Sequence, residues 1–308
     1  MGEAIRKSNA QAVGFIGLGR MGSRIAGRLL EKVFRVVAYN RSPGPLREAG
    51  KKGAITAQGY VDVAGKLAPP RIIWIMVSAG KPVDEVIEAL LPSLAKGDIL
   101  IDGGNSNYKD SMGRAGQLKA RGIFYLDAGT SGGLEGASRG ACLTIGGERE
   151  AYEKARPIFD AVSAKGGYLY AGPSGAGHFV KMVHNAIEYG MLEAYGEGFE
   201  MLKKSEFGLD LPAIARTWER GGVVRSWMLE LCRKKLEEDA EMRDVSGEIG
   251  GGESGGWAVE YAKGKGIEAP AIEASLRARG RRGDADRFAG KIVSAIRNAF
   301  GGHEMKRK

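Results

Sequence analysis

Residues 13–30 read VGFIGLGRMGSRIAGRLL, and this stretch decides the fold. The apolar run before Gly17 predicts a short buried strand, and the segment from Ser23 onward predicts a helix. Gly17 allows a tight turn, Gly19 lets the backbone approach a pyrophosphate, and Gly22 permits close helix packing, while the amino end of the helix supplies amide donors. The strand, glycine turn and helix together predict a dinucleotide-binding unit.

The alternation of short strands and helices continues to about Gly172. Short apolar runs separated by helical segments are typical of a parallel sheet that is covered by helices on both faces. The expected strands are Val13–Gly17, Val36–Asn40, Ile72–Val77, Ile99–Asp102, Phe124–Asp127, Cys142–Ile145 and Tyr168–Tyr170. This pattern predicts a doubly wound Rossmann-type α/β domain.

Beyond Gly172 the strand patterns stop and amphipathic helical patterns follow. The expected helices are His178–Lys204, Leu211–Glu219, Val223–Glu238, Trp257–Lys265, Ala271–Arg279 and Asp284–Phe300. The Gly- and Pro-rich segment 171–177 marks the change of period. We therefore predict an α/β domain over residues 1–172 and an all-helical domain over residues 173–308, as a length of 308 residues suggests at about 150 residues per domain.

Composition narrows the class of protein. The two cysteines, Cys142 and Cys232, are too few for a disulfide framework or a thiolate metal site, and we expect no metal. The longest apolar run, residues 72–77, is far shorter than a membrane span, and residues 1–7 lack the apolar core of a signal peptide. We therefore expect a cytoplasmic protein that does not bind membranes. The net charge of +9 indicates an anionic partner without identifying it.

The residues after the second expected strand bear on the choice of dinucleotide. Enzymes that use NAD usually place an Asp or Glu there, which accepts hydrogen bonds from a ribose hydroxyl. This chain has Asn40, Arg41 and Ser42 instead. Arg41 can form a charge-assisted fork to a 2′-phosphate, and its neighbours can donate further hydrogen bonds. The sequence therefore favours NADP, with NAD as the alternative.

One helical stretch, residues 177–189, combines an apolar body with a polar stripe. Lys181, His184, Asn185 and Glu188 stand at i, i+3, i+4 and i+7, so they project from one face, with Tyr189 at its edge. A stripe of mixed chemistry on an otherwise apolar helix faces either a cavity or water. The spacing alone leaves two interpretations open, a catalytic face or a solvated edge with a structural histidine.

Six ordered blocks of sequence resemble the 6-phosphogluconate dehydrogenases, a branch of the β-hydroxyacid dehydrogenases. The blocks are residues 17–22, 102–106, 129–133, 177–189, 221–226 and 297–303. They cover essentially the whole chain, and its length resembles the short form of the family, whose helical domain is reduced. The resemblance implies a decarboxylating enzyme that converts 6-phosphogluconate to ribulose 5-phosphate and carbon dioxide in the pentose phosphate pathway.

The resemblance also implies the catalytic residues. Lys181 would be the general base that takes the proton of the substrate C3 hydroxyl and returns it to the keto oxygen as carbon dioxide leaves. Burial or neighbouring positive charge would have to deprotonate this amine in part. Glu188 would then protonate C1 of the enediol. No metal is required, because the keto group accepts the electrons that decarboxylation releases.

Binding residues follow from the same resemblance. The contacts to the substrate hydroxyls and carboxylate would be Asn105, Ser131, Gly132, Gly133, His184 and Asn185. The phosphate would be bound by Tyr189, Arg225, Ser254, Arg297 and His303. The cofactor would contact Gly17, Leu18, Gly19, Arg20, Met21, Gly22, Asn40, Arg41, Ser42, Val77, Ser78 and Asn105. In this family the tail that carries the counterparts of Arg297 and His303 enters a neighbouring subunit, which implies at least a homodimer.

Two departures from the family pattern affect binding. In the segment 250–257, which resembles a substrate-binding loop, Gly252 and Gly256 stand where the long form has lysines. Ser78 likewise stands where the long form has a lysine in a loop that contacts the cofactor. Arg41 is therefore the chief candidate for selecting the charge of the cofactor.

Two alternatives remain open at this point. Another β-hydroxyacid dehydrogenase, such as a 3-hydroxyisobutyrate dehydrogenase, would share the nucleotide fold, Ser131–Gly133 and the lysine, but would not need Glu188 or the phosphate set. A basic nucleic-acid-binding protein would account for the net charge and for the cluster Arg277, Arg279, Arg281 and Arg282. Aromatic residues do not interleave with this cluster, so we interpret it as a solvated basic surface and expect no nucleic-acid partner.

Overall fold

The structure, a computed structural model, describes residues 11–281 and 283–305. It divides into two compact units, Met1–Lys181 and Met182–Lys308. The polar start of the chain, Arg282 of the basic cluster and the basic tail at 306–308 lie outside the described residues. The two units are described separately below.

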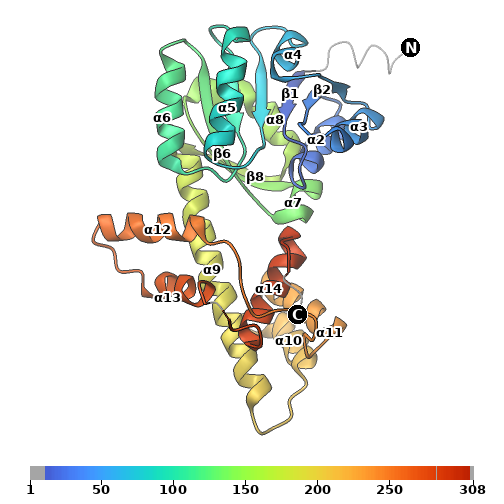
Figure 1. The fold of residues 1–308 in the computed structure, drawn as a ribbon, viewed down its shortest axis with the longest axis vertical. Helices are drawn as coiled ribbons and strands as arrows, with labels where there is room; N and C mark the ends of the chain where they lie inside the picture. Colours follow the sequence, from blue (N-terminus) through green and yellow to red (C-terminus); the bar gives the residue numbers. More distant parts are fainter. Residues whose placement is uncertain (1–10, 282, 306–308) are drawn as a thin grey trace. The chain divides into compact units, whose positions relative to one another are not determined.

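The first unit is built on an eight-stranded sheet (Figure 1). The strand order is β3-β2-β1-β4-β5-β6-β7-β8. The strands are β1 (Ala12–Ile16), β2 (Arg35–Tyr39), β3 (Ile55–Thr56), β4 (Ile72–Ile75), β5 (Ile99–Asp102), β6 (Phe124–Ser131), β7 (Ala141–Gly146) and β8 (Ser163–Gly172). This order, with β1 at the point where the chain reverses direction across the sheet, confirms the predicted doubly wound α/β fold.

The sheet differs from the expected parallel one at a single pairing. All neighbouring strands are parallel except β6 and β7, which pair antiparallel with Ser131 opposite Cys142. The connection between them holds only α7 (Gly133–Arg139). A parallel crossover needs a dozen or more residues, so this short link returns the chain in the opposite direction. Strand β3 was not predicted, because two residues are too short to show a pattern.

Helices cover both faces of the sheet, as predicted. Besides α7 they are α2 (Gly22–Glu31), α3 (Pro43–Lys51), α4 (Tyr60–Gly65), α5 (Lys81–Leu90), α6 (Tyr108–Lys119) and α8 (Arg149–Val162), with a 3₁₀ turn, η1, at Leu91–Ser93. One core cluster joins α2, α3, α7 and α8 to the sheet, and a second joins α4, α5 and α6 to the other face. Successive residues of a strand point to opposite faces, so Trp74 belongs to the first cluster and Ile73 and Ile75 to the second.

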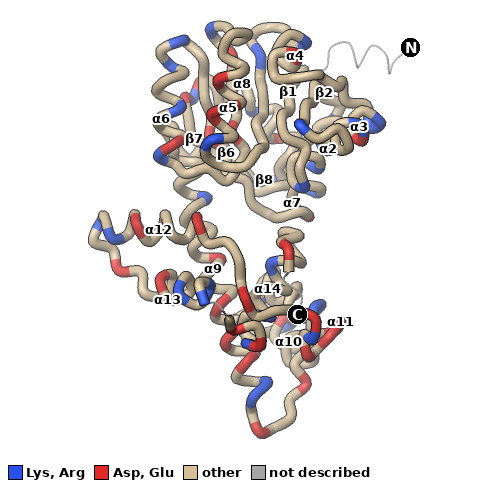
Figure 2. Tube along the Cα trace, viewed as in Figure 1, with Lys and Arg blue, Asp and Glu red and all other residues tan. Residues whose placement is uncertain are grey.

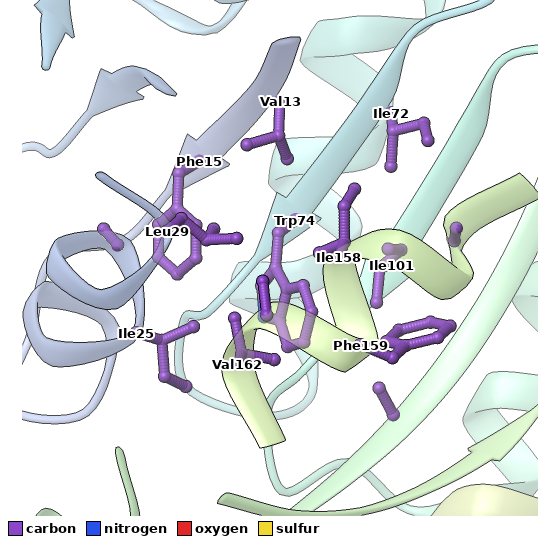
Figure 3. Packing of buried hydrophobic residues seen from close by; sticks show 14 of the residues in the cluster. Val13, Phe15, Ile25, Leu29, Ile72, Trp74, Ile101, Ile158, Phe159 and Val162 are labelled. Carbon is purple, nitrogen blue, oxygen red and sulfur yellow. The ribbon is translucent and has the colours of Figure 1, made fainter. Parts of the chain in front are cut away.

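Trp74 lies at the centre of the first cluster. It is completely buried on β4, and its ring stacks on Phe15 of β1 with the ring centroids 6.2 Å apart. Phe159 of α8 meets it edge-on, and Val162 and Ile158 of the same helix pack around it (Figure 3). Strands β1 and β4 are therefore held on a tightly packed aromatic and aliphatic layer.

The second unit is helical over its described residues, which agrees with the prediction. The long helix α9 (Ala176–Lys204) starts in the first unit, and α10 (Leu211–Gly221), α11 (Trp227–Glu238), α12 (Glu253–Gly264), α13 (Pro270–Arg279) and α14 (Phe288–Gly301) follow it. Their core includes Leu192 and Phe199 of α9, Cys232 of α11 and Ile292 of α14.

Several helix starts differ from the expected ones. Helix α11 begins at Trp227 rather than Val223, because the Ser226 hydroxyl accepts the Leu229 N–H and caps the helix there, while Val223 is fully exposed. Helix α12 begins at Glu253, so Ser254–Gly256 belong to a helix and not to the predicted loop. Helix α14 begins at Phe288 instead of Asp284.

The division between the units falls at Lys181, beyond the predicted boundary at 172/173. The first turns of α9 account for this position, because they pack directly on β6 and β7. A Cβ atom at Gly177 would lie 2.3 Å from the Asp127 carbonyl oxygen and 2.5 Å from that of Thr144. The start of α9 is therefore packed as part of the α/β unit.

The charged residues are distributed over both units without gathering by sign. Figure 2 shows Lys and Arg positions interspersed with Asp and Glu along the helices. On α11, Arg233 contacts Glu219 and Glu237, and Lys234 contacts Glu230. Such pairing is typical of a solvated surface rather than of a nucleic-acid interface. Within residues 11–281 and 283–305, no helix is long and apolar enough to cross a membrane.

Candidate active site

The glycine turn after β1 adopts the geometry that the sequence predicted. Gly17 has a φ of 99°, and a Cβ atom there would lie 2.2 Å from the Met76 carbonyl oxygen. At Gly22 a Cβ atom would meet the Gly17 carbonyl oxygen at 2.0 Å, so larger residues are excluded at both positions. A Cβ atom at Gly19 would have no neighbour within 4 Å. The backbone at Gly19 is therefore open to a ligand at the amino end of α2.

A cavity of about 220 Å³ lies at the carboxyl ends of β1, β2 and β4. Gly17, Gly19, Arg41, Val77 and Ser78 are among its lining residues. Ligands of open α/β sheets bind outside the carboxyl ends of the strands, where the chain reverses direction across the sheet. One cavity is therefore lined by the glycine turn, by Arg41, which is the candidate for selecting the charge of the cofactor, and by the loop after β4.

Asn40 has a structural role that the sequence did not reveal. Its side-chain oxygen accepts the Leu18 N–H at 2.8 Å, and its amide nitrogen donates to the Ser42 carbonyl at 3.0 Å. Asn40 thus ties the glycine turn to the turn after β2. Arg41 and Ser42 are exposed, and Arg41 lines the cavity. A phosphate at this point would find Arg41 as its charged partner.

Lys181 is held against the end of β6. Its Nζ donates to the Ser131 hydroxyl at 2.8 Å, and Ser131 is buried as the last residue of the strand. Gly132 and Gly133 follow in left-handed conformations, with φ of 105° and 59°. A Cβ atom at Gly129 would lie 2.5 Å from Cβ of Lys181, so only glycine admits the helix so close to the strand. The structure therefore brings together Lys181 and the predicted Ser131–Gly133 turn.

Asp127 fixes the start of the helix that carries Lys181. Its fully buried carboxylate on β6 accepts the N–H of Gly175 at 2.7 Å and of His178 at 2.8 Å. Burial raises the pKa of the Asp127 carboxyl, and the nearby His178 opposes the shift. The Ser111 hydroxyl meets Nδ1 of His178 at 2.7 Å. The sequence does not reveal this buried anchor, one turn before Lys181, because its pattern marks Asp127 only as the end of a strand.

In the second unit a polar cluster gathers around Tyr189 of α9. The Asn185 side chain donates to the buried hydroxyl of Ser254 on α12 at 3.3 Å. The Tyr189 ring packs on Gly255, where a Cβ atom would lie 2.7 Å from it. Tight packing at Gly255 is the reason that a small residue stands on this face of α12.

Arg279 completes this cluster, and the sequence interpretation of it was wrong. It was grouped with a solvated basic surface, but it is only 4% exposed, and its guanidinium stacks 3.6 Å above the centre of the Tyr189 ring. Arg279 ends α13 three residues after Leu276, whose side chain also reaches Gly255. The i, i+3 spacing from Leu276 indicates that Arg279 lies on the buried face of the helix. The run of arginines hides this pattern, because Arg277 and Arg281 are exposed.

Arg279 and Arg297 are close enough to affect each other. Burial, with the neighbouring Arg297, lowers the pKa of Arg279 to about 10. Burial also lowers the pKa of Arg297, while Tyr189, Glu188 and Glu253 oppose that shift. The Nη1 atom of Arg279 makes no hydrogen bond to any described residue. Arg279 is buried and Arg297 is partly buried, so their like charges repel each other, and a bound anion would relieve the repulsion and satisfy the donors.

Arg297 lies beside the Tyr189 cluster of its own chain, and the contribution of Arg297 and His303 to a neighbouring subunit stays a prediction. Its Nη2 atom is 3.2 Å from the Cβ position of Gly251. Close packing of α14 on α9 explains this placement, since a Cβ atom at Gly196 would lie 2.7 Å from the Ala289 carbonyl oxygen.

Other predicted residues lie elsewhere. Arg225 is exposed in the link before α11, where it lines an apolar cavity of about 310 Å³ with Met191, Trp218 and Val224. The His303 ring packs edge-on against Phe300, 5.9 Å between ring centres. His184 is exposed on α9. Binding of phosphate by Arg225 and His303 and of substrate by His184 stays a prediction.

Three further predicted residues lie in the glycine turn and in the turn after β5. Arg20 is exposed and Met21 partly exposed in the glycine turn, and Asn105 is exposed in the turn after β5. Among the described residues there is no group of three or more His, Cys, Asp or Glu arranged to hold a metal ion.

Comparison with protein families matches both parts of the chain. Residues 12–172 match the NAD-binding domain of 6-phosphogluconate dehydrogenase, and residues 177–280 match the C-terminal domain of 6-phosphogluconate dehydrogenase. These two matched regions meet between residues 172 and 177.

Similar proteins carry corresponding names. YqeC of Bacillus subtilis, provisionally named a 6-phosphogluconate dehydrogenase, is 44% identical over 96% of this chain and 99% of its own length. The NAD⁺-dependent decarboxylating 6-phosphogluconate dehydrogenase of Haloferax volcanii is 42% identical, again over 96% and 99%.

Solved structures show the same fold. The 6-phosphogluconate dehydrogenase of Plasmodium falciparum superposes with a TM-score of 0.78 at 30% identity, over 87% of this chain and 61% of that longer one. The 3-hydroxyisobutyrate dehydrogenase of Mycobacterium tuberculosis has a TM-score of 0.75 at 19% identity, over 94% and 99%, which is a likeness of fold alone.

Proposed function

The chain belongs to the 6-phosphogluconate dehydrogenase family, and we propose that it oxidises and decarboxylates 6-phosphogluconate to ribulose 5-phosphate and carbon dioxide with NADP. The observation that carries this choice of substrate is the buried Arg279 together with the partly buried Arg297 beside Tyr189. A small unphosphorylated β-hydroxyacid supplies no second anion for such a pair. A sugar acid phosphate has a carboxylate at one end and a phosphate at the other.

The glycine turn fits a dinucleotide, because Gly19 is open while Gly17 and Gly22 have no room for a side chain. NADP, when bound, accepts the hydride that leaves C3 of the substrate. The residues proposed to hold it are the turn 17–22, Arg41 and the loop at Val77 and Ser78. Arg41 supports NADP over NAD, because a guanidinium pairs well with a 2′-phosphate.

Lys181 is proposed as the general base. Its Nζ takes the proton of the C3 hydroxyl as C3 becomes a carbonyl, and the hydrogen bond from Nζ to Ser131 orients the amine. The bond from C2 to C1 then breaks, carbon dioxide leaves, and its electron pair forms the enediol. Lys181 returns its proton to the oxygen on C3 in this step.

Glu188 is proposed as the acid that completes the reaction. It stands two helical turns after Lys181 on α9 and delivers a proton to the enediol carbon that becomes C1 of ribulose 5-phosphate. Asn185, held by Ser254, is proposed to bind substrate oxygens between these two groups. A base and an acid on one helix can thus serve different atoms of one small sugar.

A second copy of the chain is proposed to cover the apolar side of the helical unit. Val183, Ile187, Met191, Val224 and Trp227 are all exposed on α9 and around the start of α11. Contiguous exposed apolar surface of this kind is typical of an oligomer interface. We propose at least a homodimer on this basis. The free thiols of Cys142 and Cys232 are compatible with the reducing cytoplasm, where we place the enzyme.

The direct test mixes the purified protein with 6-phosphogluconate and either NADP or NAD. Reduced nicotinamide and carbon dioxide are followed together. Formation of both in equal amounts supports the proposal. Reduction without carbon dioxide would indicate a β-hydroxyacid dehydrogenase that does not decarboxylate, and turnover of 3-hydroxyisobutyrate alone would favour that relative.

Replacing Arg41 by Ala is expected to lower the ratio of kcat/KM for NADP to that for NAD by about 10- to 100-fold. The reason is the loss of a charge-assisted hydrogen bond, worth about 1.5–3 kcal/mol. Steady-state rates with both cofactors measure the ratio. Arg47→Ala, which changes another arginine nearby in the sequence but outside the cavity lining, is the control. An unchanged ratio would show that Arg41 does not select the cofactor.

Replacing Arg279 by Met is expected to raise KM for 6-phosphogluconate by about 10- to 100-fold, because one of two phosphate forks is lost. The KM for NADP should stay the same. The matched control is Arg277→Met, since Arg277 is an exposed arginine two residues away on the same helix. Unphosphorylated gluconate provides a second comparison, because its weak turnover should not depend on Arg279. If Arg279→Met impaired turnover of gluconate as much as turnover of 6-phosphogluconate, phosphate binding by Arg279 would be contradicted.

A further inference from the structure

Arg114 of α6 is a buried arginine that reaches the segment following β4. It is 5% exposed, its Nε donates to the Asp84 carboxylate at 2.7 Å, and its Nη2 donates to the Gly80 carbonyl at 3.1 Å. Gly80 and Asp84 form the start of α5. The residues just before them, Val77 and Ser78, line the nucleotide cavity. Arg114 therefore holds the far end of the β4 loop, residues 76–80.

Arg114 also approaches the carboxylate that shapes the next turn, residues 103–107. Asp102, the fully buried last residue of β5, accepts the Gly104 N–H at 3.0 Å and the Ser106 hydroxyl at 2.7 Å. These bonds close the turn that carries Asn105. The Tyr125 hydroxyl donates to the same carboxylate at 2.8 Å, and Nη1 of Arg114 lies 3.5 Å from it.

The β4 loop and the β5 turn touch each other directly. A Cβ atom at Gly104 would lie 3.0 Å from the Val77 carbonyl oxygen. Burial alone would lower the pKa of Arg114, but its hydrogen bond to Asp84, together with Tyr125 and Asp102, raises it above its usual value. The guanidinium therefore stays charged and compensates the Asp102 carboxylate between the two segments.

We propose that Arg114 is a positioning residue that couples the β4 loop to the β5 turn and so sets how Ser78 and Asn105 are presented to the same cofactor. Arg114 does not touch substrate in this scheme. It acts through the Gly80 carbonyl and the Asp102 carboxylate. Its kinetic consequences rest on the proposed function, whereas the coupling itself does not.

A matched control lies at the amino ends of the same two strands, β4 and β5. Arg71, just before β4, binds the fully buried Asp98, just before β5, with Nη1 to Oδ2 at 2.9 Å. This ion pair also joins a buried carboxylate to a largely covered arginine between the same two strands, but it lies at their amino ends, away from the β4 loop and the β5 turn. Arg71→Met should destabilise the fold in a comparable way without affecting either segment.

The first measurement is amide hydrogen exchange on the full chain, with Arg114→Met compared with wild type and Arg71→Met. We expect exchange about tenfold faster in both residues 76–80 and residues 103–107 of Arg114→Met, since each loses a hydrogen bond or its charge partner. In Arg71→Met both segments should exchange as in wild type. Faster exchange in neither segment, or equally in both variants, overturns the coupling.

The second measurement uses 6-phosphogluconate deuterated at C3. A misplaced nicotinamide ring slows hydride transfer, so kcat/KM for NADP should fall about 10- to 100-fold in Arg114→Met. The deuterium isotope effect on kcat should rise, and neither quantity should change in Arg71→Met. If wild type does not turn over this substrate, the proposed function fails, and hydrogen exchange still decides the coupling.

Two further variants guard against a misfolded protein. Arg114→Lys keeps the charge but cannot reach Gly80, Asp84 and Asp102 together, so exchange should stay fast in at least the β4 loop. If Arg114→Lys exchanged both segments as slowly as wild type, charge alone would suffice, and the bridging role would be overturned. If Arg114→Met does not fold, Asp84→Asn replaces it, because Asp84 is 47% exposed and the buried Arg114 keeps the Asp102 carboxylate 3.5 Å away. Asp84→Asn should speed exchange in both segments, and unchanged exchange there overturns the proposal.

Discussion

Replacing Lys181 by Met is expected to lower the rate of NADP reduction with 6-phosphogluconate by about 10³-fold. Methionine has a similar length, so the close packing of α9 on Gly129 and the fold should be kept. The variant loses the amine that contacts Ser131 and takes the C3 proton in our scheme. Steady-state absorbance of reduced nicotinamide measures the effect, and the unfolding temperature checks stability.

The control for Lys181→Met is Lys204→Met, at the other end of the same helix, where Lys204 is exposed and pairs with Glu200. That variant should keep wild-type kcat and KM. The dissociation constant for NADP should be the same in all three proteins. Near-normal kcat in Lys181→Met would show that the general base is a different group.

Replacing Glu188 by Gln is expected to lower the formation of ribulose 5-phosphate by about 10²- to 10³-fold, because glutamine cannot deliver the proton to the enediol. Substrate binding should change little, since the amide has the same shape. The loss should therefore appear in kcat rather than in KM.

Deuterium exchange separates this role from a structural one. Wild-type protein incubated with ribulose 5-phosphate in D₂O should exchange one hydrogen at C1, and Glu188→Gln should exchange it far more slowly. Glu197→Gln, an exposed position of the same helix, is the control. If Glu188→Gln exchanged C1 hydrogen at the wild-type rate, the proton donor would be another residue.

The fold could be predicted in outline because its signals are local. The glycine turn at 17–22 and the alternation of short apolar runs indicate a doubly wound sheet before any tertiary contact is known. The antiparallel pairing of β6 and β7 could not be predicted, because strand direction depends on the length and path of the α7 connection. The predicted start of α11 at Val223 is wrong, because the apolar Val223 and Val224 extend the helical pattern, whereas the Ser226 cap fixes the first helical residue at Trp227.

The candidate site could be predicted only in part. Lys181 and Ser131 are 50 residues apart in sequence, and the family resemblance alone predicts that they belong to one site. Arg279 was missed because a run of arginines resembles a solvated surface, and its burial depends on Tyr189 and Leu276 from two helices. The roles of Asn40 and Asp127 depend on backbone donors far along the chain, which no residue pattern encodes.

Asp127 determines where this chain can be divided into fragments. A fragment ending at residue 172 would lack the amides of Gly175 and His178, which donate to this fully buried carboxylate. A buried neutral group that loses its hydrogen-bond partner destabilises the fold by about 1–3 kcal/mol, and a buried charged group destabilises it by more. A nucleotide-binding fragment, or a chimaera that exchanges helical units between relatives, should therefore be joined within α9 after Lys181.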